Sequence, residues 1–152
     1  MLWGCLAGMS IVNRELDTAE NALASINEID KVQYINKIKE LPSDASKMAG
    51  LAIFSGQYKE AESIYLNAKL YYRAIKLNIK LFKWERALEL ALMNKTHIDT
   101  VIAYRSRYLQ QLGAVEDIDK FKQFADKIEI NWETIKEKIK KDKEAEKGKA
   151  NN

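Results

Sequence analysis

Apolar residues recur at helical spacing in three stretches of the chain. In each stretch a first apolar set is followed, after a polar interval, by a second set built around an alanine. The sets are Trp3, Leu6, Ala7 with Ala19, Leu23, Ile26; Met48, Ala49, Ala52 with Ala61, Tyr65, Ala68; and Tyr71, Ala74, Ile75 with Ala87, Ala91. Spacings of three and four residues put such residues on one face of a helix. The pattern therefore predicts three pairs of helices that pack through their apolar faces.

The second helix of each predicted pair carries an alanine where two backbones must approach closely: Ala19, Ala61 and Ala87. This alternation of large and small positions is typical of tetratricopeptide (TPR) helix pairs, whose arrays bind other proteins. The three alanines are separated by 42 and 26 residues, so the repeat is irregular, and an extra apolar-periodic segment over 29–41 explains the longer interval. We expect an all-α, TPR-like helical-repeat solenoid of antiparallel helix pairs. An ordinary all-helical bundle stays open as the alternative.

Periodicity and breaker residues together predict ten helices joined by short connections. Their expected ranges are 2–13, 16–26, 28–40, 44–55, 58–68, 70–82, 84–94, 97–112, 115–127 and 132–146. The expected N-cap residues are Asn27, Ser43, Thr96 and Asn131, and the first and third of these precede an acid by three residues, as in a capping box. Gly56 and Gly113 follow apolar segments, where a helix commonly ends in a left-handed residue. No run of alternating β-branched residues predicts a strand.

The charge of the chain is concentrated at its end. The formal net charge is +3, and residues 136–149 alone carry seven lysines and four acidic residues, so the remaining chain is neutral. Apolar positions stop at Ile139, and such a charge run is usually solvated. We therefore expect one TPR-like domain over 1–139 and a charged, frayed or disordered tail over 140–152. A neutral body also argues against nucleic-acid binding, which favours a basic stripe on the folded surface.

Motifs of catalysis are not found in the sequence. It has no phosphate-binding glycine loop, no nucleophile elbow and no metal-ligand cluster, so we expect no enzyme activity, cofactor or metal. The single histidine, His97, falls in the expected capping box after Thr96, where a structural role is favoured over a catalytic one. The single cysteine, Cys5, lies among apolar residues and is expected to be a buried structural thiol in a reducing compartment.

Two places stand out as candidate interface or structural sites. The first helix presents Trp3, Leu6, Met9 and Val12, an apolar surface that we expect to be buried in an interface. This segment is too short to span a bilayer and lacks the basic start of a signal peptide, so we expect no membrane insertion.

Arg105 is the second candidate, because it interrupts the apolar face of the helix expected over 97–112. A buried arginine usually has an internal acidic partner, for which Glu89 and Asp117 are the candidates. The alternative is that this face is a groove in which Arg105 meets a carboxylate of a partner protein.

Three blocks carry a family resemblance: residues 28–35 (EIDKVQYI), 84–91 (WERALELA) and 95–105 (KTHIDTVIAYR). In these blocks the chain closely resembles the C-terminal helical region of the intraflagellar transport protein 80 family, subunits of the ciliary transport B complex. Residues 3–12 and 131–133 extend the likeness, so it reaches from the start of the chain to about Lys140. The family carries two WD-repeat propellers ahead of this region. Since no Trp-Asp dipeptide or blade-length β pattern occurs here, we expect either a fragment of such a protein or a separately encoded C-terminal piece.

The resemblance implies a non-enzymatic scaffold subunit that supports cilium assembly and cargo transport. The implied partners are other subunits of the intraflagellar transport B complex, and a homo-oligomer formed through the first helix is also expected. The implied location is the cilium or flagellum, the ciliary base and the cytoplasm. Two other functions stay open: a helical-repeat adaptor of another coat-like complex, and an RNA-binding helical module that uses tyrosines and the lysine-rich tail.

Overall fold

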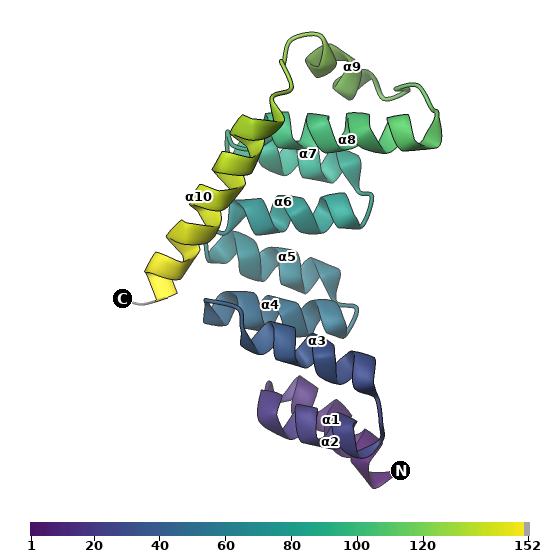
Figure 1. Cartoon of the computed structure of the whole chain (residues 1–152), viewed down its shortest axis with the longest axis vertical. Helices are drawn as coiled ribbons and strands as arrows, with labels where there is room; N and C mark the ends of the chain where they lie inside the picture. Colours follow the sequence, from purple (N-terminus) through teal and green to yellow (C-terminus); the bar gives the residue numbers. More distant parts are fainter. Residues whose placement is uncertain (151–152) are drawn as a thin grey trace. The chain divides into compact units, whose positions relative to one another are not determined.

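A computed structural model describes residues 1–150 as an all-α structure with ten helices and no strand, and it describes side chains through residue 149 (Figure 1). The helices are α1 (Leu2–Val12), α2 (Leu16–Ser25), α3 (Ile29–Lys39), α4 (Asp44–Phe54), α5 (Tyr58–Asn67), α6 (Tyr71–Lys80), α7 (Trp84–Met93), α8 (Ile98–Leu112), α9 (Asp119–Ala125) and α10 (Trp132–Ala150). The expected all-α helical-repeat fold is confirmed. The expected helix over 115–127 is wrong in its bounds, because α9 is much shorter.

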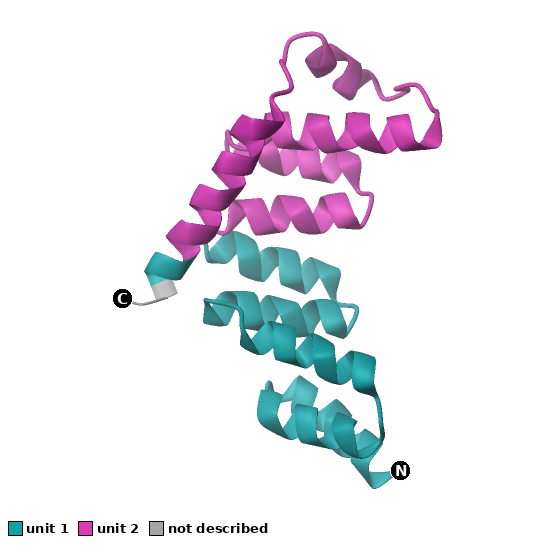
Figure 2. Ribbon diagram, viewed as in Figure 1, with its two compact units in different colours: residues 1–68, 147–152 teal, residues 69–146 magenta. Residues whose placement is uncertain are grey.

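The contacts within the chain divide it into two compact units. The domain bounds expected at 1–139 and 140–152 stay a prediction. Among the described residues, the first unit comprises 1–68 and 147–150, and the second comprises 69–146 (Figure 2). Helix pairs α1/α2 and α4/α5 pack within the first unit, and α6/α7 within the second.

The three alanines of the sequence pattern occupy the close-packed positions expected of them. Ala19, Ala61 and Ala87 lie in α2, α5 and α7, the second helix of each pair, and all three are completely inaccessible to solvent. A buried position with no spare volume tolerates a methyl group and little more, because extra methylenes would push the backbones apart. The helix pairs therefore meet where the sequence predicted.

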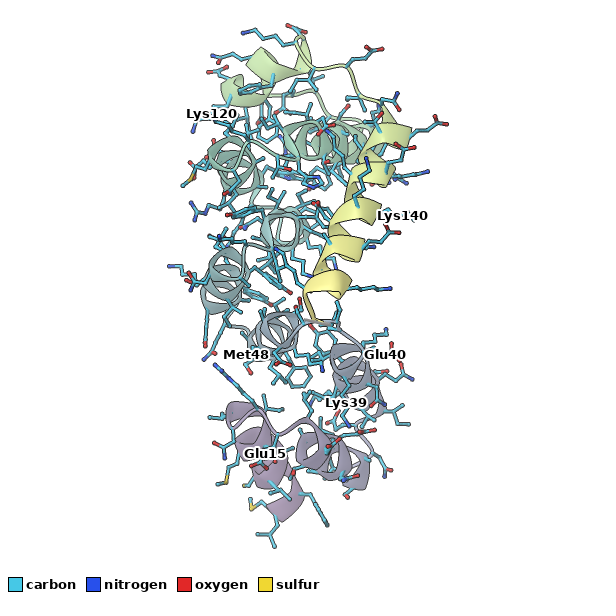
Figure 3. All side chains as sticks on the ribbon, turned by 90° about the vertical axis from the view of Figure 1, so that its left-hand side faces the viewer. Glu15, Lys39, Glu40, Met48, Lys120 and Lys140 are labelled. Carbon is cyan, nitrogen blue, oxygen red and sulfur yellow. The ribbon has the colours of Figure 1, made fainter. Side chains whose placement is uncertain are left out.

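Buried side chains of α1, α2, α3 and α4 pack together to form the hydrophobic core of the first unit. Its fully buried members are Ala7, Ala22, Leu23, Ile35, Ile38 and Leu51. Gly50 of α4 permits the approach of α3, because a Cβ at this position would lie 3.0 Å from Cγ1 of Ile38. At the surface, the Lys39 ammonium joins α3 to α2 through the carboxylates of Asp17, 2.5 Å away, and Glu20 (Figure 3).

The turns between helices depend on left-handed backbone at residues that are mostly not glycine. Gly56 and Gly113 have φ of 76° and 64°, which confirms the two expected helix ends. The same region is occupied by Arg14, Asn27, Lys69, Phe82, Lys95 and His97. Asn27 is therefore a turn residue, and the expected capping box is wrong there: the N-cap of α3 is Glu28, without a side-chain hydrogen bond. Ser43 and Asn131 are confirmed as caps, since each accepts a hydrogen bond from an N–H of the following first turn.

Of the tail that we expected to be frayed or disordered over 140–152, residues 140–150 continue α10, and residues 151–152 lie outside the described residues. Lys138, Asp142 and Glu146 recur every four residues and so share one face of this helix. In the second unit this face crosses the N-terminal ends of α6 and α8 (Figure 1). The Lys138 ammonium lies 2.6 Å from Asp99. The carboxylate of Asp142 lies 2.6 Å from Nε2 of His97.

Glu146 is the most deeply placed of these three side chains. Its carboxylate accepts a hydrogen bond of 2.6 Å from Nε of Arg73 in the first turn of α6, and the residue is only 3% exposed. Negative charge is also stabilised by the positive end of a helix dipole. By contrast, the side chains of Lys140 (Figure 3) and Glu144 are 79% and 63% exposed, and their charged atoms lie 3.9 Å apart. Charge alone could not distinguish the docked face of this segment from its solvated face.

We predict that Glu146→Gln lowers the free energy of unfolding of the chain by about 1–3 kcal/mol, because it removes a charged partner from Arg73 at a buried site. Urea denaturation at neutral pH measures this change. The matched control is Glu144→Gln on the exposed face of α10, which should change stability by less than about 0.5 kcal/mol. Equal effects of the two substitutions would show that the contact of Glu146 with Arg73 does not stabilise the chain, which is what a frayed tail would give.

Candidate functional site

The first helix presents an apolar surface formed by Trp3, Leu6, Met9 and Val12, here named the α1 surface. These residues are 50%, 39%, 64% and 78% exposed, respectively. Helix α1 carries no charged residue, so burying one side against α2 leaves apolar side chains on the others.

Two glycines and the cysteine add to this open side of α1. A Cβ added at Gly4 or Gly8 would meet no atom within 4 Å, so a second helix could approach α1 closely along this flank. Cys5 is also exposed, and the expectation of a buried thiol is wrong, because the buried face of α1 is formed by Ala7 and Ser10 instead. The α1 surface is thus larger than the four residues that define it.

Arg105 lies at the centre of an ionic network in the second unit, and it is 8% exposed. Its Nε lies 3.0 Å from Glu116, and its Nη2 lies 3.1 Å from Glu116 and 3.2 Å from Asp117. The guanidinium carbon lies 5.6 Å from the ring centre of Trp84 and 5.7 Å from that of Phe121, which is cation–π range. The internal partner expected at Asp117 is therefore present.

The expected partner Glu89 binds elsewhere, at 3.4 Å from Arg86. Glu116, the main partner of Arg105, was not among the expected partners, although it is the residue next to Asp117. Residues 114–118 are non-helical, and both acids of this connection reach back to α8.

The pKa of Glu116 reflects this placement. Burial acts to raise the pKa of its carboxyl, but the hydrogen bonds from Arg105 and from the backbone N–H of Ile118 outweigh burial, so the pKa lies below its ordinary value of 4.5. The carboxylate of Glu116 therefore stays ionised in the folded chain, and it anchors the connection between α8 and α9 to the middle of α8.

His97 is buried and holds α10 against the start of α8. Its Nδ1 lies 3.0 Å from the hydroxyl of Thr100, its Nε2 contacts Asp142, and its ring centre lies 4.9 Å from that of Tyr72. Burial, with Tyr104 and Asp142 adding to it, raises the pKa of Tyr72 to about 12, so this ring stays neutral. These contacts suit a structural histidine.

The capping box expected at Thr96 and Asp99 is wrong in its detail. The N-cap residue of α8 is His97 itself, in a left-handed conformation and without a side-chain cap. One Asp99 oxygen accepts a hydrogen bond from the N–H of Thr100, and the other binds Lys138.

No group of three or more His, Cys, Asp and Glu side chains within the described residues is arranged to hold a metal ion. Over residues 1–150, none of the helices combines the length and the apolar character that crossing a lipid bilayer requires.

Comparison with known proteins matches the whole array of helices just described. Residues 2–148 match the family model of the IFT80/172/WDR35/WDR19 TPR domain. The chain belongs to this TPR-domain family. It is 54% identical over 138 residues to the Intraflagellar transport protein 80 homolog of Rattus norvegicus and 53% identical to that of Mus musculus, which confirms the resemblance read from the sequence. Both alignments cover 91% of this chain but only 18% of the relative, so the chain spans less than a fifth of those proteins.

More distant members of the family match a shorter part of the chain. The WD repeat-containing protein 35 of Homo sapiens is 32% identical over 89 residues, which are 59% of this chain and 8% of that protein. The Intraflagellar transport protein osm-1 of Caenorhabditis elegans is 33% identical over 102 residues, covering 59% of this chain and 6% of that protein. Helical repeats commonly act by binding other proteins, so the exposed surfaces of the helices are the candidate functional sites.

We predict that Glu116→Gln destabilises the chain by about 1–2 kcal/mol at pH 7, and that the difference from the unsubstituted chain disappears in acid. The pKa of Glu116 is lower in the folded chain than its ordinary value of 4.5, so its contribution to stability is complete above that value and is lost as pH falls through the folded pKa. Denaturation at several pH values between 7 and 3 measures the trend. Glu129→Gln, on an exposed connection, is the control. A difference between the chains that did not change with pH would contradict the assignment.

Proposed function

We propose that this chain is a non-enzymatic scaffold element of the intraflagellar transport B complex, which supports cilium assembly and cargo transport. The observation that carries the proposal is the family match over residues 2–148, together with relatives that are named intraflagellar transport proteins. Helical repeats of this kind work through extended surfaces that contact other proteins. The chain would accordingly act in the cilium or flagellum, at the ciliary base and in the cytoplasm.

The proposed partners are other subunits of the same complex, and the α1 surface is the proposed contact. Its four residues are large, apolar and at least 39% exposed, and such surfaces on folded domains commonly mark interaction sites. We include self-association among the interactions that this surface supports. Arg105 is assigned a structural role, because its guanidinium is bound to Glu116 and Asp117 within its own unit.

Proximity labelling from the chain in ciliated cells tests the proposed function. We expect recovery of other transport-complex subunits, and a lower recovery with Met9→Lys, which places a charge on the α1 surface. Asn21→Lys, which adds the same charge at an exposed position of α2, is the matched control and should recover the subunits normally. Recovery of another coat-like complex, or of RNA-binding proteins and RNA, would overturn the proposal in favour of the two other functions left open by the sequence.

Light scattering of the purified chain tests self-association through the α1 surface. We expect the solution mass to rise with concentration across the micromolar range, and Met9→Lys to suppress this rise while Asn21→Lys does not, because only the former charges the apolar contact. The unfolding midpoint of each variant separates association from folding. A strictly monomeric mass over that range would exclude self-association and leave other subunits as the occupants of the α1 surface.

A further inference from the structure

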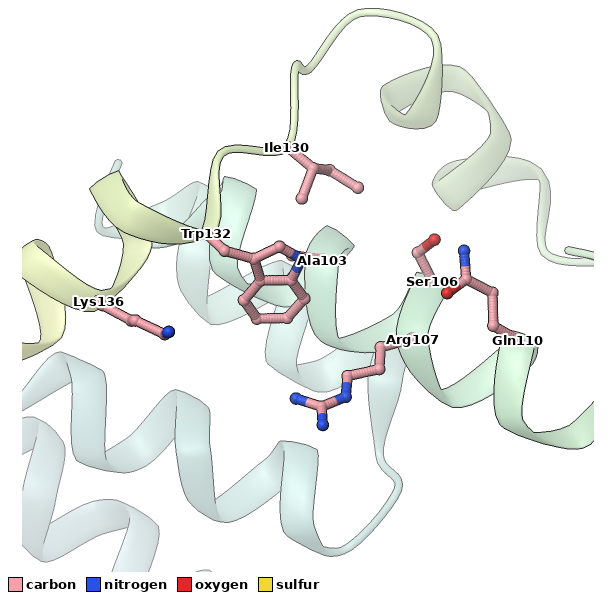
Figure 4. Close-up of a pocket in the computed structure, with 7 residues that line it drawn as sticks. All are labelled: Ala103, Ser106, Arg107, Gln110, Ile130, Trp132 and Lys136. Carbon is pink, nitrogen blue, oxygen red and sulfur yellow. The ribbon is translucent and has the colours of Figure 1, made fainter.

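A pocket of about 480 Å³ lies in the second unit, between the C-terminal half of α8 and the beginning of α10 (Figure 4). Helix α8 contributes Ser106, Arg107 and Gln110 to its lining, and α10 contributes Trp132 and Lys136. In Figure 4 the indole of Trp132 lies between the ammonium of Lys136 and the guanidinium of Arg107. We name this hollow the Trp132 pocket.

The charge of the Trp132 pocket is positive and uncompensated. Its lining includes two cationic residues and no acidic one. Neither Arg107 nor Lys136 forms an ion pair with a carboxylate among residues 1–149. Two neighbouring cations on the same helices do have acidic partners, since Arg105 binds Glu116 and Lys138 binds Asp99. Arg107 and Lys136 are therefore available for an anionic ligand.

The aromatic wall of the Trp132 pocket is held in place by its neighbours. The rings of Tyr104 and Trp132 form an edge-to-face pair, with ring centres 5.6 Å apart and an angle of 85° between the planes. The guanidinium of Arg107 lies 5.8 Å from the centre of the Trp132 ring. Asn131 caps the first turn of α10, and Ile135 of that turn is fully buried. A preformed wall of this kind reduces the entropy lost when a ligand binds.

A second, apolar hollow adjoins the Trp132 pocket across α8. It has a volume of about 200 Å³, and its lining includes Leu109, Ala114 and Phe121. Ser106 and Gln110 line both hollows, so they form the ridge between them. Their hydroxyl and amide groups can donate to and accept from the backbone of a peptide that crosses this ridge.

We propose that the Trp132 pocket binds an acidic segment of a partner protein, with a carboxylate held by Arg107 and Lys136 and an apolar side chain of the same segment in the adjoining hollow. This inference rests on the proposed scaffold function, from which it takes that the partner is a protein. It adds the chemistry of the segment of that partner which is recognised. Carboxylates pair closely with a planar guanidinium, and the aromatic wall covers the adjacent alkyl groups. A nucleic acid fits less well, because two cations around a single pocket do not form the extended basic track that a phosphate backbone requires.

Binding of short synthetic peptides to the purified full chain tests the pocket. The probes are fluorescein-labelled, capped hexapeptides that contain two glutamates and one leucine, with the leucine one to three residues away from the nearer glutamate. Matched peptides carry glutamine in place of each glutamate. Fluorescence anisotropy is expected to show salt-sensitive binding of at least one glutamate peptide and about tenfold weaker binding of its glutamine counterpart, since the charge pairing is lost.

Variants of the chain locate the binding. Arg107→Gln and Lys136→Gln should each weaken binding by severalfold or more, and both replaced side chains are exposed. Lys140→Gln, which removes a charge from the exposed side of α10, is the matched control and should bind normally. Thermal unfolding of all three variants checks that each retains its fold.

The outcomes separate this inference from the proposed function. Equal binding of glutamate and glutamine peptides, unchanged binding by Arg107→Gln, or no binding of any peptide would each overturn the acidic-segment proposal. An oligouridylate that binds more tightly than the peptides, with the same dependence on Arg107, would overturn it in favour of nucleic acid. None of these results changes the recovery of transport-complex subunits in cells, which tests the scaffold function on its own.

Discussion

Close approach of two helix backbones at a buried alanine is the constraint on which each helix pair depends. Ala19, Ala61 and Ala87 are completely buried, and each belongs to the second helix of its pair. A larger side chain at such a crossing would separate the helices and expose the apolar faces that they cover. Gly50 extends the same constraint to the contact of α4 with α3, where even a methyl group would meet Ile38 at 3.0 Å. The smallest residues of these helices therefore set the distance between neighbouring helix axes.

The local part of this fold could be predicted from the sequence. Apolar spacing located the helices through α8 to within one or two residues, and Ser43, Asn131, Gly56 and Gly113 have the expected terminal roles. These features depend on neighbours within one helical turn, which is the range that periodicity and capping describe. The left-handed turn residues Lys69 and Phe82 were not foreseen, because nothing in their side chains favours positive φ over other residues.

The candidate sites depend on contacts between distant parts of the chain, and these were harder to predict. The exposure of Met9 and Val12 follows from α1 being apolar all round, which the sequence shows directly. The partner of Arg105 was expected correctly at Asp117 but missed at Glu116, because which of two neighbouring acids reaches the guanidinium depends on the backbone of the connection after α8. The Trp132 pocket joins residues of α8 and α10, and its positive charge depends on which nearby cations already have acidic partners. The sequence alone does not show which cations are paired with acids in the folded chain.

The docking of α10 has a consequence for the order in which the second unit is completed. The pair of Arg73 and Glu146 joins residues 73 positions apart, and that of His97 and Asp142 joins residues 45 apart. Helix pairs formed from neighbouring segments close only short loops and can assemble while the rest of the chain is being synthesised. The N-terminal ends of α6 and α8 must wait for residues translated much later before they gain their last ionic partners. The contacts of Asp142 and Glu146 are therefore among the last that the second unit can gain during synthesis.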